Sequence, residues 1–271
     1  MKVLSILSVF AVLLSPLSSH QTRFMLNYIE EVRANNEKTA YNWYCKHHKD
    51  GRVPAVDSQM SFIENYDAYY VDRSATEENK TVYLTFDAGY ENGNVEKVLD
   101  TLKEKNAPGA FFILENLALM NPELVRRMAD EGHLVCNHTA IHRDMTTVCR
   151  KDEFESELNR LSEAVFSSCG VEVAKVYRPP EGRFSERNLK WASELGYKTV
   201  FWSFAYADWD NNSQPDPTSS LKKIIECAHP GEILLLHPTS ATNAAILGDL
   251  IDSYREKGYT FKSLEELFET R

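Results

Sequence analysis

The chain has 271 residues, of which 43% are hydrophobic and 26% are charged, and its formal net charge is −10. These proportions are typical of a folded globular protein rather than of a disordered one. The chain has no cluster of lysine, arginine and aromatic residues, which is the basic footprint that nucleic-acid binding requires, so we expect no nucleic-acid partner.

The first 20 residues have the pattern of an export signal peptide. Lys2 supplies a positive start, and the run from Val3 to Leu14 is almost entirely apolar. Small and polar residues follow, as they do before a cleavage site. The apolar run is shorter than the roughly 20 residues that cross a bilayer, and retention as an N-terminal anchor is the alternative to cleavage. We expect an exported protein, located outside the cell or at the cell-wall or membrane surface.

Residues 21–79 are polar and irregular, and we interpret them as a leader segment. From residue 80 onward, short apolar runs alternate with segments of helical spacing. The predicted strands are Val82–Phe86, Ala110–Leu114, Leu134–Cys136, Val176–Tyr177, Thr199–Phe204, Ile233–Leu236 and Tyr259–Phe261. The predicted helices are Val95–Lys105, Pro122–Glu131, Lys151–Ser168, Ser185–Leu195, Ser219–Ala228 and Ala244–Lys257. Four of these helices are followed by a glycine suited to a C-terminal cap, at Gly132, Gly196, Gly231 and Gly258.

Strand followed by helix, repeated about seven times, predicts a parallel sheet with helices packed outside it. A barrel and an open doubly wound sheet both satisfy this pattern. In such folds, chemistry collects in the loops after the C-terminal ends of the strands. Ionisable or metal-binding residues stand after five of the predicted strands, and we expect them at one rim: Asp87, His138 with His142, Arg178, Asp208 and His237.

Two histidines in this set have the spacing of a metal-binding pair. His138 and His142 are four residues apart, so in a helical turn both imidazoles face one point. Neutral imidazole is a common ligand of zinc and similar divalent ions. The five cysteines, by contrast, form no CxxC pair, and the sequence leaves open any disulfide among Cys45, Cys136, Cys149, Cys169 and Cys227.

Five motifs occur in a fixed order: TFDAG at residues 85–89, HTAIH at 138–142, RPPEG at 178–182, DW at 208–209 and LLLH at 234–237. In this order they resemble the polysaccharide deacetylase family, also called the NodB-homology or carbohydrate esterase 4 family. The resemblance implies a distorted (β/α)7-type barrel over residues 80–271. It also implies an enzyme that removes N-acetyl groups from a carbohydrate by hydrolysis.

The resemblance implies a role for each matching residue. Asp87 would be the general base, oriented by Arg178, and His237 would be the general acid, paired with Asp208. A divalent metal would be held by His138 and His142. Leu235 and Trp209 would line the acetyl pocket, and the backbone N–H of Glu181 would help to hold the oxyanion. Contacts with sugar hydroxyls are expected from Glu91 and Asn92, with loop capping as an equal alternative.

Ala88 departs from the family pattern, because most members carry an aspartate there as a third metal ligand. Losing a charged oxygen contact weakens the affinity for zinc or a similar metal. The departure resembles one branch of the family, the delta-lactam-biosynthetic or muramic de-N-acetylases, whose pattern FDxGYENG matches residues 86–93. The leader residues Asn42-Trp43-Tyr44 also look like that branch.

That branch acts on N-acetylmuramic acid of peptidoglycan whose stem peptide has been removed, which leads to muramic δ-lactam, typically in spore cortex. We therefore expect a monomeric, metal-dependent hydrolase whose partner is a peptidoglycan glycan strand. Because such a glycan carries an anionic lactyl group, local positive charge is needed, and Arg178, Arg183 and Arg143 are the candidates. For Arg183 and Arg143, a solvated surface position is at least an equal alternative.

Three other interpretations share part of the pattern. A peptidoglycan N-acetylglucosamine or chitin-oligosaccharide deacetylase would use the same chemistry on another sugar. An inactive glycan-binding barrel would follow if the metal were lost with Ala88, but the retained ionisable residues argue for catalysis. A glycoside hydrolase with Asp87 and Asp208 as its two carboxylates ranks last, because Arg178 and the histidine pair accompany them.

Overall fold

The computed structural model describes residues 23, 25, 26, 28 and 37–269. The predicted signal peptide, residues 1–20, lies outside the described residues. The chain from Ala40 onward forms one compact unit. Among the described helices, none combines the length and the apolar character that a membrane crossing requires.

The strands of this unit form a small antiparallel pair and one large parallel sheet. Their bounds are β1 (Tyr41–Asn42), β2 (Ala68–Tyr69), β3 (Thr81–Ala88), β4 (Gly109–Ile113), β5 (Leu134–Asn137), β6 (Val176–Tyr177), β7 (Arg183–Phe184), β8 (Lys198–Val200), β9 (Glu232–Leu236) and β10 (Thr260–Phe261). The large sheet has the order β10-β3-β4-β5-β6-β8-β2, and β9 also pairs with β3. A parallel bridge between Phe204 and Leu234 joins β9 to the chain that leaves β8. The sheet therefore curls into the expected distorted barrel rather than an open sheet.

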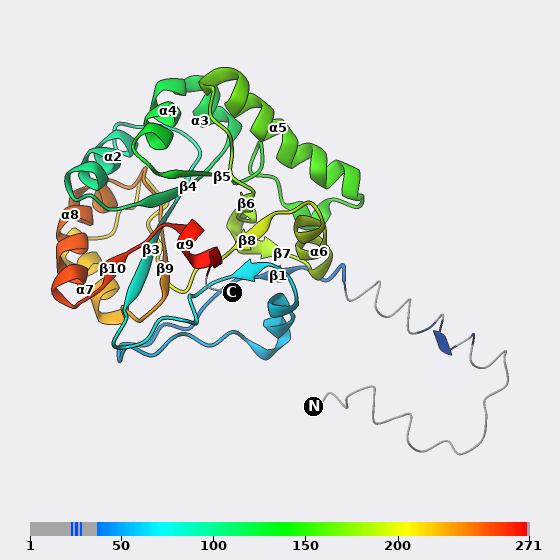
Figure 1. Ribbon diagram of the computed structural model, residues 1–271, viewed down its shortest axis with the longest axis horizontal. Helices are drawn as coiled ribbons and strands as arrows, with labels where there is room; N and C mark the ends of the chain where they lie inside the picture. Colours follow the sequence, from blue (N-terminus) through cyan, green and yellow to red (C-terminus); the bar gives the residue numbers. More distant parts are fainter. Residues whose placement is uncertain (1–22, 24, 27, 29–36, 270–271) are drawn as a thin grey trace, which may run out of the picture. The chain divides into compact units, whose positions relative to one another are not determined.

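Helices surround this barrel, as Figure 1 shows for α2, α4, α5 and α8 around the central strands. Their bounds are α2 (Val95–Glu104), α3 (Glu115–Met120), α4 (Pro122–Asp130), α5 (Lys151–Cys169), α6 (Glu186–Glu194), α7 (Pro217–Cys227), α8 (Ala241–Glu256) and α9 (Leu264–Glu269). Short 3-10 turns occur at η2 (Ser58–Asn65), η3 (Met145–Thr147) and η4 (Pro180–Gly182). The four glycines predicted as caps all have positive φ angles, between 76° and 84°.

Alternation along β3 determines which side chains face the barrel interior. Val82, Leu84 and Phe86 belong to the apolar cluster that also contains residues of the surrounding helices. Tyr83 belongs to a second cluster together with side chains of β4, β5, β6, β8 and β9. Because successive side chains of a strand point to opposite faces, Thr85 and Asp87 share the interior face with Tyr83. The sequence pattern of β3 thus places Asp87 inside the barrel.

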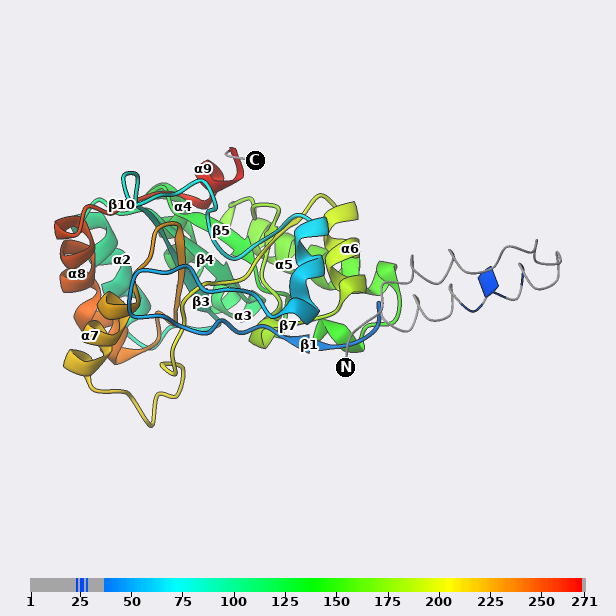
Figure 2. The same ribbon diagram turned by 90° about the horizontal axis from the view of Figure 1, so that it is seen from below.

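The two ends of the barrel differ in what covers them. Leu264 and Leu267 of α9 belong to the interior cluster, and β10 pairs with the first residues of β3, Thr81 and Val82. Helix α9 therefore covers the end where the strands begin. In Figure 2, the yellow loop that precedes α7 lies on the opposite side of the barrel from α9.

The predicted strand Thr199–Phe204 is wrong in its extent, because β8 ends at Val200 and the chain then changes partners. Phe201 N–H bonds to the backbone oxygen of Tyr69, whereas Ser203 N–H bonds to that of Ile233. The hydrogen-bonding partner of the chain therefore changes from β2 to β9 between Phe201 and Ser203. A continuous apolar run cannot reveal such a change of partner.

Residues 40–79 are not a separate leader, and a boundary at residue 80 does not divide the compact unit. They supply β1, which pairs with β7, and β2, which pairs with β8. Trp43 is 4% exposed, its ring stacks on Phe201 at 4.4 Å, and its Nε1 donates to the backbone oxygen of Trp202. This segment therefore covers the seam where the barrel chain changes partners.

Gly231 lies where residues 40–79 meet β9, at a position that excludes a side chain. Its φ is +76°, and an added Cβ would lie 2.1 Å from the backbone oxygen of Asp72. We expect Gly231→Ala to lower the free energy of unfolding in urea by ~3 kcal/mol or more, from backbone strain and forced displacement.

Gly196→Ala is the matched control, because its φ is +78° but no atom lies within 4 Å of the added Cβ. It should cost only about 1 kcal/mol. Equal losses in the two variants would contradict the assignment of Gly231 to a close backbone approach.

Candidate active site

A cavity of about 620 Å³ lies at the C-terminal ends of the barrel strands. Its lining comes from the ends of β3, β5 and β9 and from the loops that follow β6 and β8. The lining residues are Asp87, Ala88, Gly89, Tyr90, Leu114, His138, His142, Glu181, Gly182, Trp202, Ala205, Tyr206, Trp209, Leu235, His237 and Thr239. The predicted site residues Arg178 and Asp208 are buried behind this lining.

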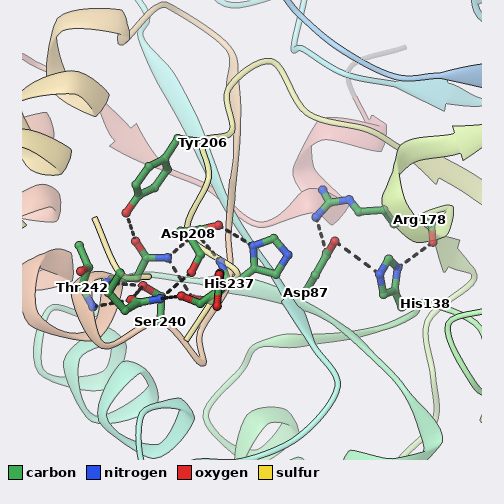
Figure 3. Close-up of polar contacts among 11 residues, drawn as sticks. Asp87, His138, Arg178, Tyr206, Asp208, His237, Ser240 and Thr242 are labelled. Atoms are coloured by element: carbon green, nitrogen blue, oxygen red, sulfur yellow. Dashed lines mark hydrogen bonds and ion pairs between the residues drawn. The ribbon is translucent and has the colours of Figure 1, made fainter. Parts of the chain in front are cut away.

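The carboxylate of Asp87 is held by a guanidinium inside the barrel. Arg178 Nη1 donates to Asp87 Oδ1 at 2.8 Å, and Arg178 itself is fully buried. The second oxygen, Oδ2, lies 3.5 Å from His138 Nε2. Figure 3 shows Asp87 between these two partners. Burial by itself raises the pKa of Asp87, but the charge and hydrogen bond of Arg178, together with the charges of His138 and His237, outweigh it and hold that pKa below its usual value.

His138 has the tautomer that a metal ligand needs. Its Nδ1 lies 2.9 Å from the backbone oxygen of Arg178, and a carbonyl only accepts, so Nδ1 carries the proton. Nε2 then presents a lone pair toward Asp87. Burial lowers the pKa of His138 to about 4, so the ring is neutral near neutral pH. Both properties favour metal binding through Nε2.

The two histidines of the HTAIH motif meet, but the predicted helical turn is wrong. Thr139 and His142 have φ angles of 69° and 60°, which break any helix. The loop is held instead by Asn137, which accepts the N–H of Thr139, and by Glu157, which accepts the N–H of Ile141. The ring centroids of His138 and His142 still lie 5.0 Å apart.

The donor set fits a weakly held metal. His138 and His142 offer imidazole nitrogens beside the Asp87 carboxylate, whereas Ala88, at the position of the usual third ligand, is buried and offers no donor atom. Within the described chain, no group of three or more histidine, cysteine or acidic side chains has the geometry of a metal site.

On the other side of the cavity, Asp208 holds His237. His237 Nδ1 lies 2.7 Å from Asp208 Oδ1, and the backbone N–H of His237 donates to Oδ2 at 2.9 Å. Figure 3 shows the His237 ring between Asp208 and Asp87. Burial lowers the pKa of His237, but the hydrogen bond and charge of Asp208, with the charge of Asp87, outweigh it and raise that pKa. The protonated ring therefore persists to higher pH than that of a free histidine.

The predicted substrate-binding residues divide into two groups. Leu235, Trp209 and Glu181 line the cavity, and the Trp209 ring lies edge-on to that of His237 at 6.2 Å. The other two residues are not in the lining. Glu91 accepts backbone N–H groups at the start of α2, and Asn92 donates to the backbone oxygen of Thr239, which is the loop-capping alternative.

The three arginines considered as sources of positive charge all form ion pairs with acidic side chains of the protein. Arg183 pairs with Asp144 at 3.0 Å, and Arg143 pairs with Glu153 at 2.8 Å. Arg178 is occupied by Asp87. The cavity lining, within the described residues, contains neither lysine nor arginine. All five cysteines lie in the described part of the chain as free thiols, and Cys136, Cys169 and Cys227 are buried.

Sequence reasoning missed several residues that support the site. Thr85 Oγ1 accepts from Arg178 Nη2 at 2.9 Å, and Asn243 donates to Asp208. Tyr206 and Trp202 line the cavity. Thr85 had a usable signal, because it is two residues before Asp87 on the same strand face. Asn243 had none, since its partner is 35 residues away.

The pKa of His237 tests this electrostatic arrangement directly. Replacing Asp208 by Asn removes the strongest influence that raises it and leaves burial, which lowers it. We expect Asp208→Asn to lower the pKa of His237 relative to that of the wild type in an NMR titration of the ring. Asp210→Asn, an exposed neighbour on the same loop, should leave it unchanged. An unaltered pKa in Asp208→Asn would contradict the pairing.

Known proteins resemble this chain in sequence and in fold. The chain is similar over residues 74–200 to a family model described as polysaccharide deacetylase. It is 43% identical over 227 residues to the peptidoglycan-N-acetylmuramic acid deacetylase PdaA of Bacillus subtilis, covering 83% of this chain and 85% of that protein. It is 32% identical to a peptidoglycan-N-acetylglucosamine deacetylase of Bacillus cereus, over 78% of this chain and 75% of that one.

The solved structures agree. The structure of Bacillus subtilis PdaA, described as a family 4 carbohydrate esterase, has a TM-score of 0.81 and 42% identity, over 86% of this chain and 99% of that one. A family 4 carbohydrate esterase from Bacillus anthracis has a TM-score of 0.70 and 37% identity, over 86% and 98%. The chain therefore belongs to the polysaccharide deacetylase family, carbohydrate esterase family 4, as its five motifs predict.

Proposed function

We propose that the protein hydrolyses the N-acetyl group of N-acetylmuramic acid in peptidoglycan whose stem peptide has been removed. The observation that carries the chemistry is a base and an acid across one cavity. Asp87 has a lowered pKa and His237 a raised one, which favours the ionised form of the base and the protonated form of the acid. Similarity to a deacetylase named for N-acetylmuramic acid supports the sugar.

The residues divide the reaction between them. Asp87 takes a proton from the attacking water, whose oxygen bonds to the acetyl carbon. The C–N bond then breaks, and His237 Nε2 donates a proton to the leaving amine, which yields acetate and a free amino sugar. A divalent metal such as zinc, held by His138 and His142, would polarise the acetyl carbonyl. Leu235 offers an apolar wall for the acetyl methyl, and the backbone N–H of Glu181 is our candidate for the oxyanion.

The charge of the lining favours a second candidate, hydrolysis of a neutral N-acetylglucosamine or chitin oligosaccharide. The described lining has no lysine or arginine to pair with a lactyl carboxylate, and Glu181 adds an exposed carboxylate. The similarity to an N-acetylglucosamine deacetylase at 32% identity also supports it. An inactive glycan-binding barrel is less favoured, because simple sugar binding needs neither ion pair.

The cellular setting is part of the proposal. The signal-like pattern of residues 1–20 supports export, and a peptidoglycan substrate requires a location outside the cell membrane. Closure of the new amine onto the lactyl carboxylate would give muramic δ-lactam, in spore cortex. We propose a monomer that depends on a weakly held metal.

Loss of the base tests the mechanism. Asp87→Asn keeps the size of the side chain but cannot take a proton, and we expect acetate release to fall at least ~100-fold. Binding of the glycan, measured by calorimetry, should change little, because the cavity shape is kept. Wild-type acetate release from the variant would contradict the assignment of Asp87.

The substrate is tested by mass spectrometry on two glycans, peptide-stripped muramyl glycan and chitotetraose, each with and without chelator. We expect loss of one acetyl group from the muramyl glycan, with slower turnover of chitotetraose and inhibition by chelator.

Glu181→Gln should raise turnover of the anionic glycan relative to the neutral one, because it removes like-charge repulsion. Faster turnover of chitotetraose by the wild type would select the second candidate, and new reducing ends would indicate a glycoside hydrolase.

A further inference from the structure

A buried amide joins the first turn of α8 to the His237–Asp208 pair. Asn243 lies three residues after Ser240, the N-cap of α8, and Ser240 Oγ accepts its backbone N–H at 3.1 Å. The side chain of Asn243 is buried, with the residue 1% exposed. A buried amide must have partners for its donors and its acceptor. The partners of Asn243 all belong to the site.

The amide of Asn243 contacts three residues that different parts of the chain supply. Its Nδ2 donates to Asp208 Oδ2 at 2.6 Å and to the backbone oxygen of His237 at 3.0 Å. Its Oδ1 accepts a hydrogen bond from the hydroxyl of Tyr206. The carboxylate of Asp208 and the backbone oxygen of His237 can only accept, so they determine that the NH₂ group faces them and that Oδ1 is left for the Tyr206 hydroxyl.

The backbone of the Asp208 loop is held separately. Gln214 Nε2 donates to the backbone oxygen of Asp208 at 3.0 Å. Gln214 Oε1 accepts from Ser240 Oγ at 2.6 Å and from the N–H of Thr242 at 3.2 Å. Gln214 therefore fixes the backbone of the loop to α8, whereas Asn243 contacts the carboxylate of Asp208. A change at Asn243 leaves the loop anchored.

Removing the Asn243 amide would allow the carboxylate of Asp208 to rotate about its terminal torsion. Asp208 Oδ1 accepts from His237 Nδ1, while Oδ2 accepts from the backbone N–H of His237 and from Asn243. The terminal torsion of an aspartate is broad and has little intrinsic preference. Without the amide, one backbone N–H is the remaining restraint on Oδ2. The bond from Oδ1 to the imidazole then loses its fixed geometry.

We propose that Asn243 is a positioning residue for the general acid, which holds the Asp208 carboxylate so that His237 keeps its proton on Nδ1 and presents Nε2 to the cavity. The inference rests on the proposed function, because it assumes that His237 donates a proton. Tyr206 extends the arrangement to the cavity wall, since it lines the cavity and donates to the amide oxygen.

The test compares two asparagines in the same local setting. Asn188 also lies three residues after a serine N-cap, Ser185 of α6, and is also 1% exposed. Its amide donates to the backbone oxygen of Met145 at 3.0 Å, away from the cavity. Asn243→Leu and Asn188→Leu thus remove a buried amide of the same kind, and both are expected to lower the melting temperature.

Only Asn243→Leu should change the chemistry. We expect kcat for acetate release to fall ~10-fold with KM within about two-fold, as for other residues that orient a reacting group through a hydrogen bond. The alkaline limb of the pH profile should move to lower pH. Burial and the charge of Arg178 lower the pKa of His237, whereas Asp208 and Asp87 raise it. A weaker hydrogen bond from His237 to Asp208 therefore lowers this pKa. Tyr206→Phe should shift both readouts in the same direction by a smaller amount.

The outcomes separate this inference from the proposed function. A wild-type kcat and pH limb in Asn243→Leu, or the same shifts in Asn188→Leu, would overturn it. If Asn243→Leu does not fold, Tyr206→Phe with unchanged kcat and pH limb would overturn it. If the wild type releases no acetate, the proposed function fails. The NMR titration of His237 in the wild type and in Asn243→Leu still measures the positioning effect, and an unchanged pKa would contradict it.

Discussion

The buried guanidinium of Arg178 is the interaction on which the rest of the site depends. It donates to Asp87, to Thr85 on the same strand face, and to the backbone oxygens of Val200 and Phe201, where the chain leaves β8. Phe112 lies against its flat face at 4.0 Å. A permanently charged group with no exposed surface is stable only when its donors are satisfied. The seam of the barrel and the orientation of the base are therefore held by one side chain.

In both halves of the site, charged partners oppose the effect of burial on the pKa. Asp87 and His237 are both largely buried, and burial alone would favour their neutral forms. Arg178 keeps the first anionic, whereas Asp208 favours the cationic form of the second. One cavity thus offers a proton acceptor and a proton donor at the same pH, which amide hydrolysis requires. Neither supporting residue lines the cavity, so both act by holding the group that does.

Ala88 bears on metal binding but not on the contacts of the acid–base residues. Its methyl group offers no donor atom to a metal and takes part in none of the contacts of Asp87, His138 and His237. The His138 ring keeps a neutral Nε2 aimed at Asp87 through its bond to the backbone of Arg178. The same arginine residue thereby orients the base through its side chain and a proposed metal ligand through its main chain.

The sequence alone determined the alternation of strands and helices, which predicts a parallel sheet with one rim that carries Asp87, His138, Arg178, Asp208 and His237. It also determined the order of five motifs, whose family resemblance implies the barrel. Both signals are local, because they depend on hydrophobic period and on which residue follows each strand. Only the tertiary structure decided that residues 40–79 complete the sheet, that the run after β8 changes partners, and that Arg183 and Arg143 are paired elsewhere. It also decided that Asn243 supports the acid. These facts depend on contacts between residues far apart in the chain, which no local pattern encodes.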